Sequence, residues 1–126
     1  MRKPRLLLVD DEVPFVANLL KLLSRRGYEV SAVYDGESAL RIVEEKEFDV
    51  VILDQNMPGK DGITVLRELK KKWPQLEVVI LTGYSSVDMA LDGFELGAYD
   101  YTTKPIKLGD LEEKIGQAFR RKTLRT

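Results

Sequence analysis

The sequence predicts a doubly wound α/β fold, in which a five-stranded parallel sheet lies between two layers of helices. Short apolar runs alternate with longer amphipathic stretches five times along the 126 residues. Three of the short runs are almost entirely aliphatic, which is typical of parallel strands covered on both faces. The length fits one compact domain with a single continuous core.

The predicted strands are of two kinds. Residues 5–9, 50–53 and 78–81 lack polar alternation, so we expect these strands at the centre of the sheet. Residues 28–33 alternate between apolar and polar side chains, which indicates an edge strand. Residues 98–101 form the fifth predicted strand.

Helices are predicted between and after the strands, and each has a plausible end. Gly27 and Gly97 stand where a left-handed residue commonly terminates a helix. Trp73 precedes Pro74, and a residue before proline avoids helical geometry. The predicted helices cover residues 13–26, 37–45, 62–72, 86–96 and 108–122.

Composition excludes several kinds of function. The 20 basic and 21 acidic residues are interspersed and leave a net charge of −1, which favours neither nucleic acid nor an anionic membrane as a partner. Histidine and cysteine are absent, so the chain has no imidazole base, thiolate metal site or phosphohistidine of its own. The first residues contain only four consecutive apolar side chains before an acidic group, too few for a signal peptide or membrane helix. A cytoplasmic protein is expected.

Acidic side chains follow two of the central strands. Asp10, Asp11 and Glu12 come after the first strand and Asp54 after the third, and ligands of open α/β sheets bind at these strand ends. Asp10 and Asp11 alone could be helix-capping residues, but Asp54 adds a carboxylate to the same rim. Two unit charges about 4 Å apart repel by roughly 4 kcal/mol at an effective dielectric near 20, so the acids predict a bound cation. Mg²⁺ is favoured because it prefers oxygen ligands.

Two more side chains are expected at this rim. Lys104 precedes Pro105, so its backbone is held extended and its ammonium can pair with a carboxylate or, later, a phosphoryl oxygen. Thr82 ends the fourth strand beside Gly83, which permits close backbone approach.

In these features the sequence resembles the receiver domain of two-component response regulators, over essentially the whole chain. The resemblance implies a flavodoxin-like three-layer sandwich with sheet order 2-1-3-4-5, a receiver domain over residues 1–122, and a tail or linker start at 123–126. The matching residues are the acidic pair Asp10 and Asp11, the phosphoacceptor Asp54, the loop DQNMPGKDG at 54–62, the switch hydroxyl Thr82, the switch aromatic Tyr101, and the pair Lys104-Pro105.

The resemblance also implies a role for each site residue. Asp11 and Asp54 would bind Mg²⁺ through their side chains, Asn56 through its backbone carbonyl and Asp10 through a water molecule. Lys104 would hold the phosphoryl group. Thr82 would then hydrogen-bond a phosphoryl oxygen, and Tyr101 would move inward.

Such a chain is a phosphoacceptor switch rather than an enzyme acting on other substrates. Because it lacks histidine, the donor would be a phosphohistidine of a sensor histidine kinase or histidine phosphotransfer protein. The readout would be the face formed by the fourth helix, fifth strand and fifth helix, which signals a downstream protein or an output domain, with transcription regulation favoured. Homodimerisation of the phosphorylated form is left open. Candidate readout residues are Tyr84, Leu96, Tyr101, Ile106 and Leu108.

The first helix carries more apolar residues than one core stripe needs. Val16 and Leu20 add an apolar pair, four residues apart, to a stripe formed by Phe15, Leu19, Leu22 and Leu23. The pair is either part of a wide buried face or an exposed docking surface for the phosphoryl donor.

Two other functions are compatible with part of the pattern. A haloacid dehalogenase-like hydrolase also uses an aspartate nucleophile and Mg²⁺, but position 56 is Asn where its Asp-x-Asp motif needs a second acid. A flavodoxin-like cofactor-binding module needs a small, hydroxyl-rich phosphate loop after the first strand, where this chain has three acids.

Overall fold

The computed structural model describes residues 2–83 and 86–124, in which strands and helices alternate. The elements are β1 (Arg5–Val9), α1 (Val13–Arg25), β2 (Glu29–Val33), α2 (Gly36–Glu45), β3 (Val50–Leu53), α3 (Gly62–Lys72), β4 (Glu77–Thr82), α4 (Val87–Glu95), β5 (Asp100–Thr103) and α5 (Leu108–Leu124). None of the helices in the described residues combines the length and apolar character needed to cross a membrane.

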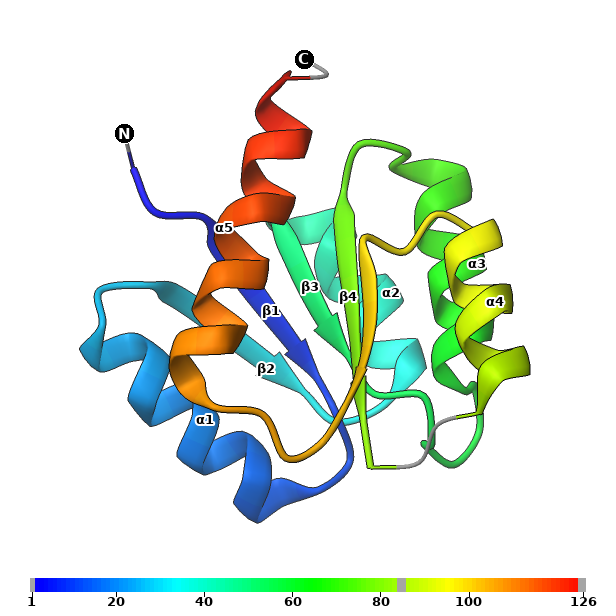
Figure 1. Cartoon of the computed structure of the whole chain (residues 1–126), viewed down its shortest axis with the longest axis horizontal. Helices are drawn as coiled ribbons and strands as arrows, with labels where there is room; N and C mark the ends of the chain where they lie inside the picture. The colour runs from blue at the N-terminus through cyan, green and yellow to red at the C-terminus, as the bar shows by residue number, and fades with distance from the viewer. Residues whose placement is uncertain (1, 84–85, 125–126) are drawn as a thin grey trace.

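The strands form one parallel sheet of order β2-β1-β3-β4-β5 (Figure 1). This confirms the predicted topology, with the alternating strand β2 at an edge and the aliphatic strands β1, β3 and β4 at the centre. Every residue of β3 and β4 is buried. Because all strands point the same way, the residues that follow β1, β3, β4 and β5 gather at one end of the sheet.

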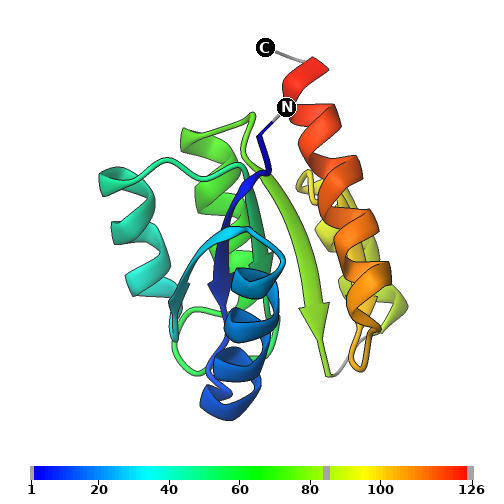
Figure 2. The ribbon, with the colours of Figure 1, turned by 90° about the vertical axis from the view of Figure 1, so that its left-hand side faces the viewer.

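Two apolar cores lie on opposite faces of the sheet. One contains side chains of α2 and α3, with Leu96 and Tyr101 packed against it, and the other contains side chains of α1 and α5. Figure 2 shows α2 and α5 on opposite sides of the strands. The result is the expected three-layer sandwich.

The fifth strand begins two residues later than predicted. Gly97 has a φ of 99°, and the amide of Ala98 donates to the carbonyl of Gly93 at 2.9 Å, closing the C-terminal end of α4. Ala98 is therefore used by the helix cap and is buried without belonging to β5, which starts at Asp100. Helix α5 extends two residues past its predicted end, to Leu124, while the domain boundary placed at residue 122 stays a prediction.

The interpretation of Val16 as an exposed docking residue is wrong. Its side chain is 1% exposed and belongs to the core under α1, with Leu19 and Leu23. Phe15, predicted in the core stripe, is half-buried and packs against this core. The buried face of α1 therefore includes Val16 as well. Leu20 is half-buried and packs against the same core, and its role in docking stays a prediction.

Two buried carboxylates, Asp49 and Glu77, bind cationic side chains at the end of the sheet opposite the acidic rim. Asp49, before β3, is fully buried and accepts bonds from Arg2 (2.6 Å), the amide of Arg5 (2.7 Å) and Lys122 of α5 (3.0 Å). Burial alone would raise the pKa of Asp49, but these hydrogen bonds prevail and hold it well below its usual range. Glu77 is likewise buried and pairs with Arg121. The C-terminal turns of α5 are therefore attached to the sheet.

Candidate functional site

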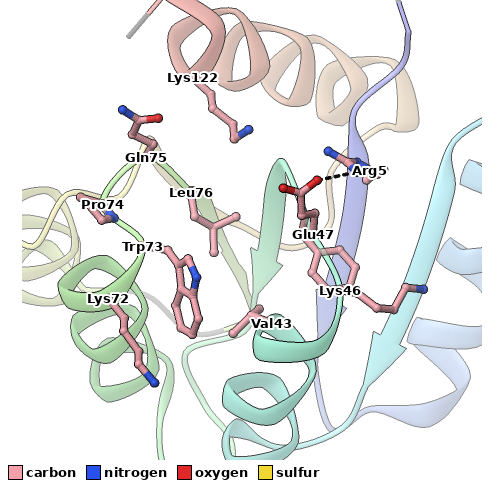
Figure 3. Close-up of a pocket in the computed structure, with 11 residues that line it drawn as sticks. Arg5, Val43, Lys46, Glu47, Lys72, Trp73, Pro74, Gln75, Leu76 and Lys122 are labelled. Carbon is pink, nitrogen blue, oxygen red and sulfur yellow. Dashed lines mark hydrogen bonds and ion pairs between the residues drawn. The ribbon is translucent and has the colours of Figure 1, made fainter. Parts of the chain in front are cut away.

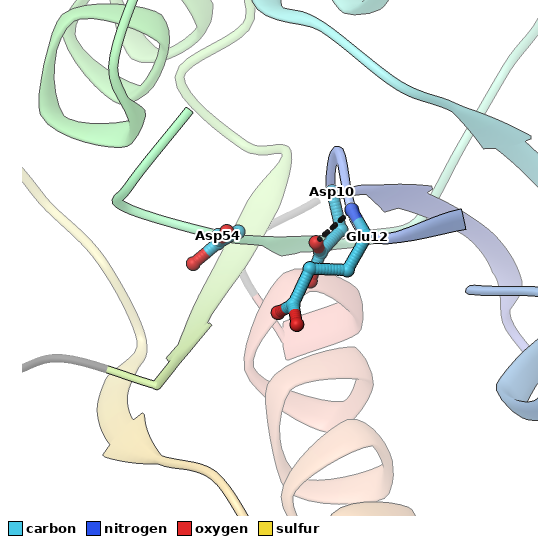
Figure 4. Close-up of side chains that lie close together, drawn as sticks. All are labelled: Asp10, Glu12 and Asp54. Carbon is cyan, nitrogen blue, oxygen red and sulfur yellow. Dashed lines mark hydrogen bonds between the residues drawn. The ribbon is translucent and has the colours of Figure 1, made fainter. Parts of the chain in front are cut away.

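Three carboxylates meet at the C-terminal end of the sheet (Figure 4). Asp10 and Asp54 are buried and are placed by the sheet itself, since their amides donate to Val33 (3.3 Å) and Val9 (2.9 Å). The third is Glu12, which is exposed. One carboxylate oxygen from each lies within 4.8 Å of the others. A cluster of this kind is stabilised by a cation, because the like charges repel.

The structure brings Glu12, rather than Asp11, into this cluster. The amide of Glu12 donates to Asp10 Oδ1 at 2.9 Å, which turns the chain tightly before α1. Glu12 occupies the N-cap position of α1, but its side chain makes no capping bond. Asp11 is half-buried and lies outside the three-carboxylate group, so its role as a metal ligand stays a prediction.

Lys104 supplies the positive charge of the resting site. Its ammonium donates to Asp10 Oδ2 at 2.7 Å and to Glu12 Oε1 at 2.5 Å, and lies 4.1 Å from the centroid of the Phe15 ring. Its amide donates to the carbonyl of Thr82 at 2.7 Å, which ties the loop after β5 to the end of β4. Although burial acts to lower it, the bonds to Asp10 and Glu12 raise the pKa of Lys104. The lysine is therefore charged at neutral pH.

The carboxylates fit a hard divalent cation. Burial raises the pKa of Asp10, and the nearby charge of Asp54 adds to this effect, while the bonds from Lys104 and the Glu12 amide oppose it. The site thus carries more negative charge than Lys104 balances. Its convergent donors are all oxygens, which suits Mg²⁺ better than a softer metal.

The loop after β3 connects Asp54 with Thr82. The amide of Asn56 donates to Asp54 Oδ1 at 3.3 Å, and its side-chain amide donates to Thr82 Oγ1 at the same distance. Gly62 begins α3 so close to this loop that a Cβ there would lie 2.5 Å from the carbonyl oxygen of Asp54. In the Asp-Gly pair that ends the predicted motif, Gly62 is therefore needed for close backbone approach. Asp61 caps α3 by accepting a hydrogen bond from the amide of Thr64.

The predicted switch residues lie on neighbouring strands. Thr82 is fully buried at the end of β4, and Tyr101 of β5 is opposite Ile80 in the register. The Tyr101 ring is half-buried against the core beneath α4 and contacts the position of Gly93. Among the candidate readout residues, Leu96, Ile106 and Leu108 are half-buried and pack against the two cores. Tyr84 lies outside the described residues.

A family model described as "Response regulator receiver domain" matches residues 6–116. The chain belongs to this family. The match favours the receiver interpretation over the hydrolase and the flavodoxin-like cofactor module, which share only parts of the pattern. The receiver domain also has the expected fold and acidic strand ends.

Similar proteins agree with this assignment. The receiver domain is 40% identical over 113 residues to the transcriptional regulatory protein ZraR of Salmonella typhimurium, covering 90% of this chain and 26% of that protein. It thus spans about a quarter of the length of the curated relatives it matches. It also resembles a response regulator receiver domain protein from Clostridium thermocellum, with 38% identity and a TM-score of 0.91, and a CheY-like one from Methanospirillum hungatei, with 27% identity and a TM-score of 0.94. Each of these two comparisons covers the whole of this chain and the whole of the other chain.

Three contacts of the receiver domain were missed by sequence reasoning. Glu12 was recognised as an acid at a strand end but not as a partner of Lys104. Phe15 packs against the core as predicted, but nothing local shows that its ring also faces Lys104, which is distant in the sequence. The contact between Gly93 and the Tyr101 ring had one sequence signal, a glycine inside a predicted helix. Such a glycine is costly and often marks close packing.

Proposed function

We propose that Asp54 accepts a phosphoryl group from a phosphohistidine on a sensor histidine kinase or a histidine phosphotransfer protein, in a Mg²⁺-dependent reaction. The observation that carries this proposal is the convergence of Asp10, Glu12 and Asp54, two of them buried, at the rim where Lys104 lies. Asp54 accepts a bond from the Asn56 amide, while Lys104 is bound to the other two carboxylates. These contacts support Asp54 as the nucleophile.

The transfer is a displacement at phosphorus. An Asp54 carboxylate oxygen forms a bond to phosphorus as the bond from phosphorus to the donor imidazole nitrogen breaks, and the imidazole leaves with its electron pair. Such reactions depend on positioning and charge neutralisation more than on covalent assistance. The backbone of Lys104 is held by the hydrogen bond from its amide to the Thr82 carbonyl. The ammonium can therefore exchange a carboxylate for a phosphoryl oxygen without movement of the backbone.

The metal would be held by the carboxylates of Asp11 and Asp54, by the backbone carbonyl of Asn56 and, through a water molecule, by Asp10. Glu12 stands with Asp10 and Asp54 and adds negative charge that favours the cation. Bound Mg²⁺ would neutralise the phosphoryl oxygens during transfer.

The signal would pass from Thr82 to Tyr101. A phosphoryl group on Asp54 offers strong acceptor oxygens that draw the Thr82 hydroxyl away from Asn56. Tyr101 then moves further inward, which changes the face formed by α4, β5 and α5. Helix α4 of that face carries exposed apolar side chains, at Val87, Leu91 and Phe94, that would serve as contacts for a partner.

The protein would act as a cytoplasmic switch that catalyses only its own phosphorylation and dephosphorylation. Its recipient is a downstream protein or an output domain, and the likeness to ZraR favours transcription regulation. Homodimerisation through the changed face would follow phosphorylation.

Incubation with acetyl phosphate tests the phosphoacceptor site. We expect wild type and Asp92→Asn, a control on the exposed side of α4, to gain one phosphoryl group by intact mass in the presence of Mg²⁺. Asp54→Asn should gain none, and excess EDTA should suppress the reaction. An adduct that persists in Asp54→Asn, or that forms equally fast in EDTA, would contradict the proposal.

A further inference from the structure

The ammonium of Lys104 is held by one short segment of the chain, which runs from the end of β1 into the first turn of α1. The ammonium donates to Asp10 Oδ2 at 2.7 Å and to Glu12 Oε1 at 2.5 Å. The Phe15 ring covers a further side of it, with the centroid 4.1 Å away. Among the described residues, no hydrogen bond joins this ammonium to Asp54. To bind a phosphoryl group on Asp54, the lysine must therefore give up one of its present partners.

Glu12 stands at a helix position that normally selects a different side chain. It is the N-cap residue of α1, where Ser, Thr, Asp and Asn are preferred because their short side chains accept bonds from the amides of the first turn. The Glu12 side chain makes no such bond, and Pro14 has no amide hydrogen to offer. Glutamate at this position is therefore explained by its reach to Lys104 and not by helix capping.

The two carboxylates that hold Lys104 differ in how easily they can be released. The side chain of Asp10 is 7% exposed, whereas that of Glu12 is 59% exposed. A buried carboxylate that loses its cation keeps an uncompensated charge, but an exposed one is solvated by water. Exposed ion pairs typically shift an equilibrium by about two- to fivefold at most. Glu12 is therefore the partner that Lys104 can exchange for a phosphoryl oxygen.

We propose that Glu12 is a positioning residue that retains Lys104 in the resting protein, and that phosphorylation of Asp54 requires the bond between Glu12 and Lys104 to break. Its role thus rests on the function proposed for Asp54. In the resting protein the glutamate keeps the ammonium beside Asp10, which slows phosphorylation by small donors. After transfer, a phosphoryl oxygen replaces the Glu12 oxygen at the ammonium, and the Glu12 carboxylate turns to solvent.

Two substitutions of Glu12 separate the reach of the side chain from its charge. Glu12→Asp keeps the negative charge but is one methylene shorter, and at an N-cap its carboxylate is drawn to the Phe15 amide and away from Lys104. Glu12→Gln keeps the length but loses the charge, so only a weaker neutral hydrogen bond to Lys104 remains. Retention by contact predicts that both substitutions release the lysine, whereas an effect of charge alone predicts a change only in Glu12→Gln.

The rate of reaction with acetyl phosphate is the first measurement, with Mg²⁺ saturating for each variant. An Asp54 oxygen forms a bond to phosphorus as the bond from phosphorus to the acetyl oxygen breaks, and acetate leaves. We expect Glu12→Asp to be phosphorylated about two- to fivefold faster than wild type. The phosphorylated forms should lose the phosphoryl group at equal rates, because Glu12 is already released in them.

Glu47 provides a matched control at the other end of the sheet. It is an exposed glutamate that accepts a bond from a cation, Arg5, at 3.1 Å, beside a cavity of about 360 Å³ (Figure 3). Glu47→Asp shortens the same kind of ion pair far from Asp54. It should gain and lose the phosphoryl group at the rates of wild type.

Exchange of the Lys104 ammonium hydrogens with water is the second measurement, made on unphosphorylated protein without Mg²⁺. Nitrogen-15 NMR at low temperature follows this exchange, and Lys104→Arg identifies the signal by its loss. Because the bond to Glu12 protects one of the hydrogens, exchange should be about two- to fivefold faster in Glu12→Asp than in wild type. Glu47→Asp should leave it unchanged.

Four results would overturn the proposal. Faster phosphorylation of Glu12→Gln but not of Glu12→Asp would mean that Glu12 acts through its charge alone. Unchanged ammonium exchange in Glu12→Asp would show that Glu12 does not retain the lysine. Phosphoryl loss accelerated as much as phosphoryl gain would place the effect on both reactions and not on the resting protein. Failure of wild type to be phosphorylated on Asp54 would reject the proposed function and, with it, the release step, although the ammonium exchange would still report the resting contact.

Discussion

The ring of Tyr101 in β5 lies directly against Gly93 in α4. A Cβ at position 93 would come within 3.2 Å of Tyr101 Cδ2 and 3.3 Å of Ile80 Cδ1, closer than most real contacts. Glycine inside a helix costs roughly 0.5–1 kcal/mol relative to alanine, so this glycine has a packing role. It provides the space in which the Tyr101 ring lies.

Gly93→Ala should displace Tyr101 without stabilising the protein. The gain in helix propensity is offset by the crowded contact, so we expect the free energy of unfolding to change by less than about 0.5 kcal/mol. With fluorotyrosine incorporated, the ¹⁹F resonance of Tyr101 should shift.

Gly116→Ala in α5 is the matched control, because nothing lies within 4 Å of its added Cβ. It should stabilise the protein by about 0.5–1 kcal/mol and leave the Tyr101 resonance in place. Equal stabilisation by both substitutions, with an unmoved Tyr101, would show that Gly93 does not position the ring.

Repulsion among the carboxylates should be visible in metal-free protein. In EDTA, Asp54→Asn removes one negative charge from the cluster and should raise the free energy of unfolding by about 1 kcal/mol, measured with urea. Mg²⁺ should stabilise wild type by binding the native state and should stabilise Asp54→Asn much less. Asp92→Asn should behave as wild type in both conditions. A destabilised Asp54→Asn in EDTA would argue against the crowding of charge.

Burial of Val16 changes the expected effect of a charge in α1. Val16→Glu should destabilise the protein by at least about 3 kcal/mol, because it places an unpaired carboxylate in the core. Val13→Glu, at a side chain that is 54% exposed on the same helix, should change stability by no more than about 0.5 kcal/mol. Thermal unfolding compares the two. A tolerated Val16→Glu would mean that α1 is rotated relative to this structure.

Asp49 should make stability depend on pH in acid. Because its pKa is lower in the folded protein than in the unfolded chain, its contribution is complete above the ordinary carboxyl pKa of about 4 and is lost as the pH falls below that value. Asp49→Asn should therefore cost about 3–5 kcal/mol at pH 7, and the difference from wild type should shrink below pH 4. Urea unfolding at a series of pH values measures this. A difference that stays constant into acid would rule out the ion pairs as its cause.

The sequence determines the central strands well, because their aliphatic runs are long enough to be covered on both faces. Residues 50–53, for example, form β3 with no change of bounds. The start of β5 was harder to predict, since Ala98 is apolar and buried, yet its amide bonds the end of α4. Local pattern shows that a residue is buried but not which element uses its backbone.

The site was predictable where residues follow strands and less so where side chains meet across the fold. Asp10, Asp54, Thr82 and Lys104 lie where parallel strand ends must bring them. Val16 and Phe15 are adjacent apolar residues on one helix, and periodicity alone did not show that Val16 is buried while Phe15 is half-buried beside Lys104. The pairing of Glu12 with Lys104 joins residues far apart in the sequence and required the three-dimensional structure.

The position of the phosphoryl group tests the assignment of Asp54 as the phosphoacceptor. After reaction with acetyl phosphate and Mg²⁺, borohydride reduces an aspartyl phosphate to homoserine, which peptide sequencing by mass spectrometry can locate. We expect homoserine at position 54 and unmodified aspartate at positions 10 and 11. Homoserine at either of those positions, or a phosphoryl group that resists reduction and maps to a serine or threonine, would contradict this assignment.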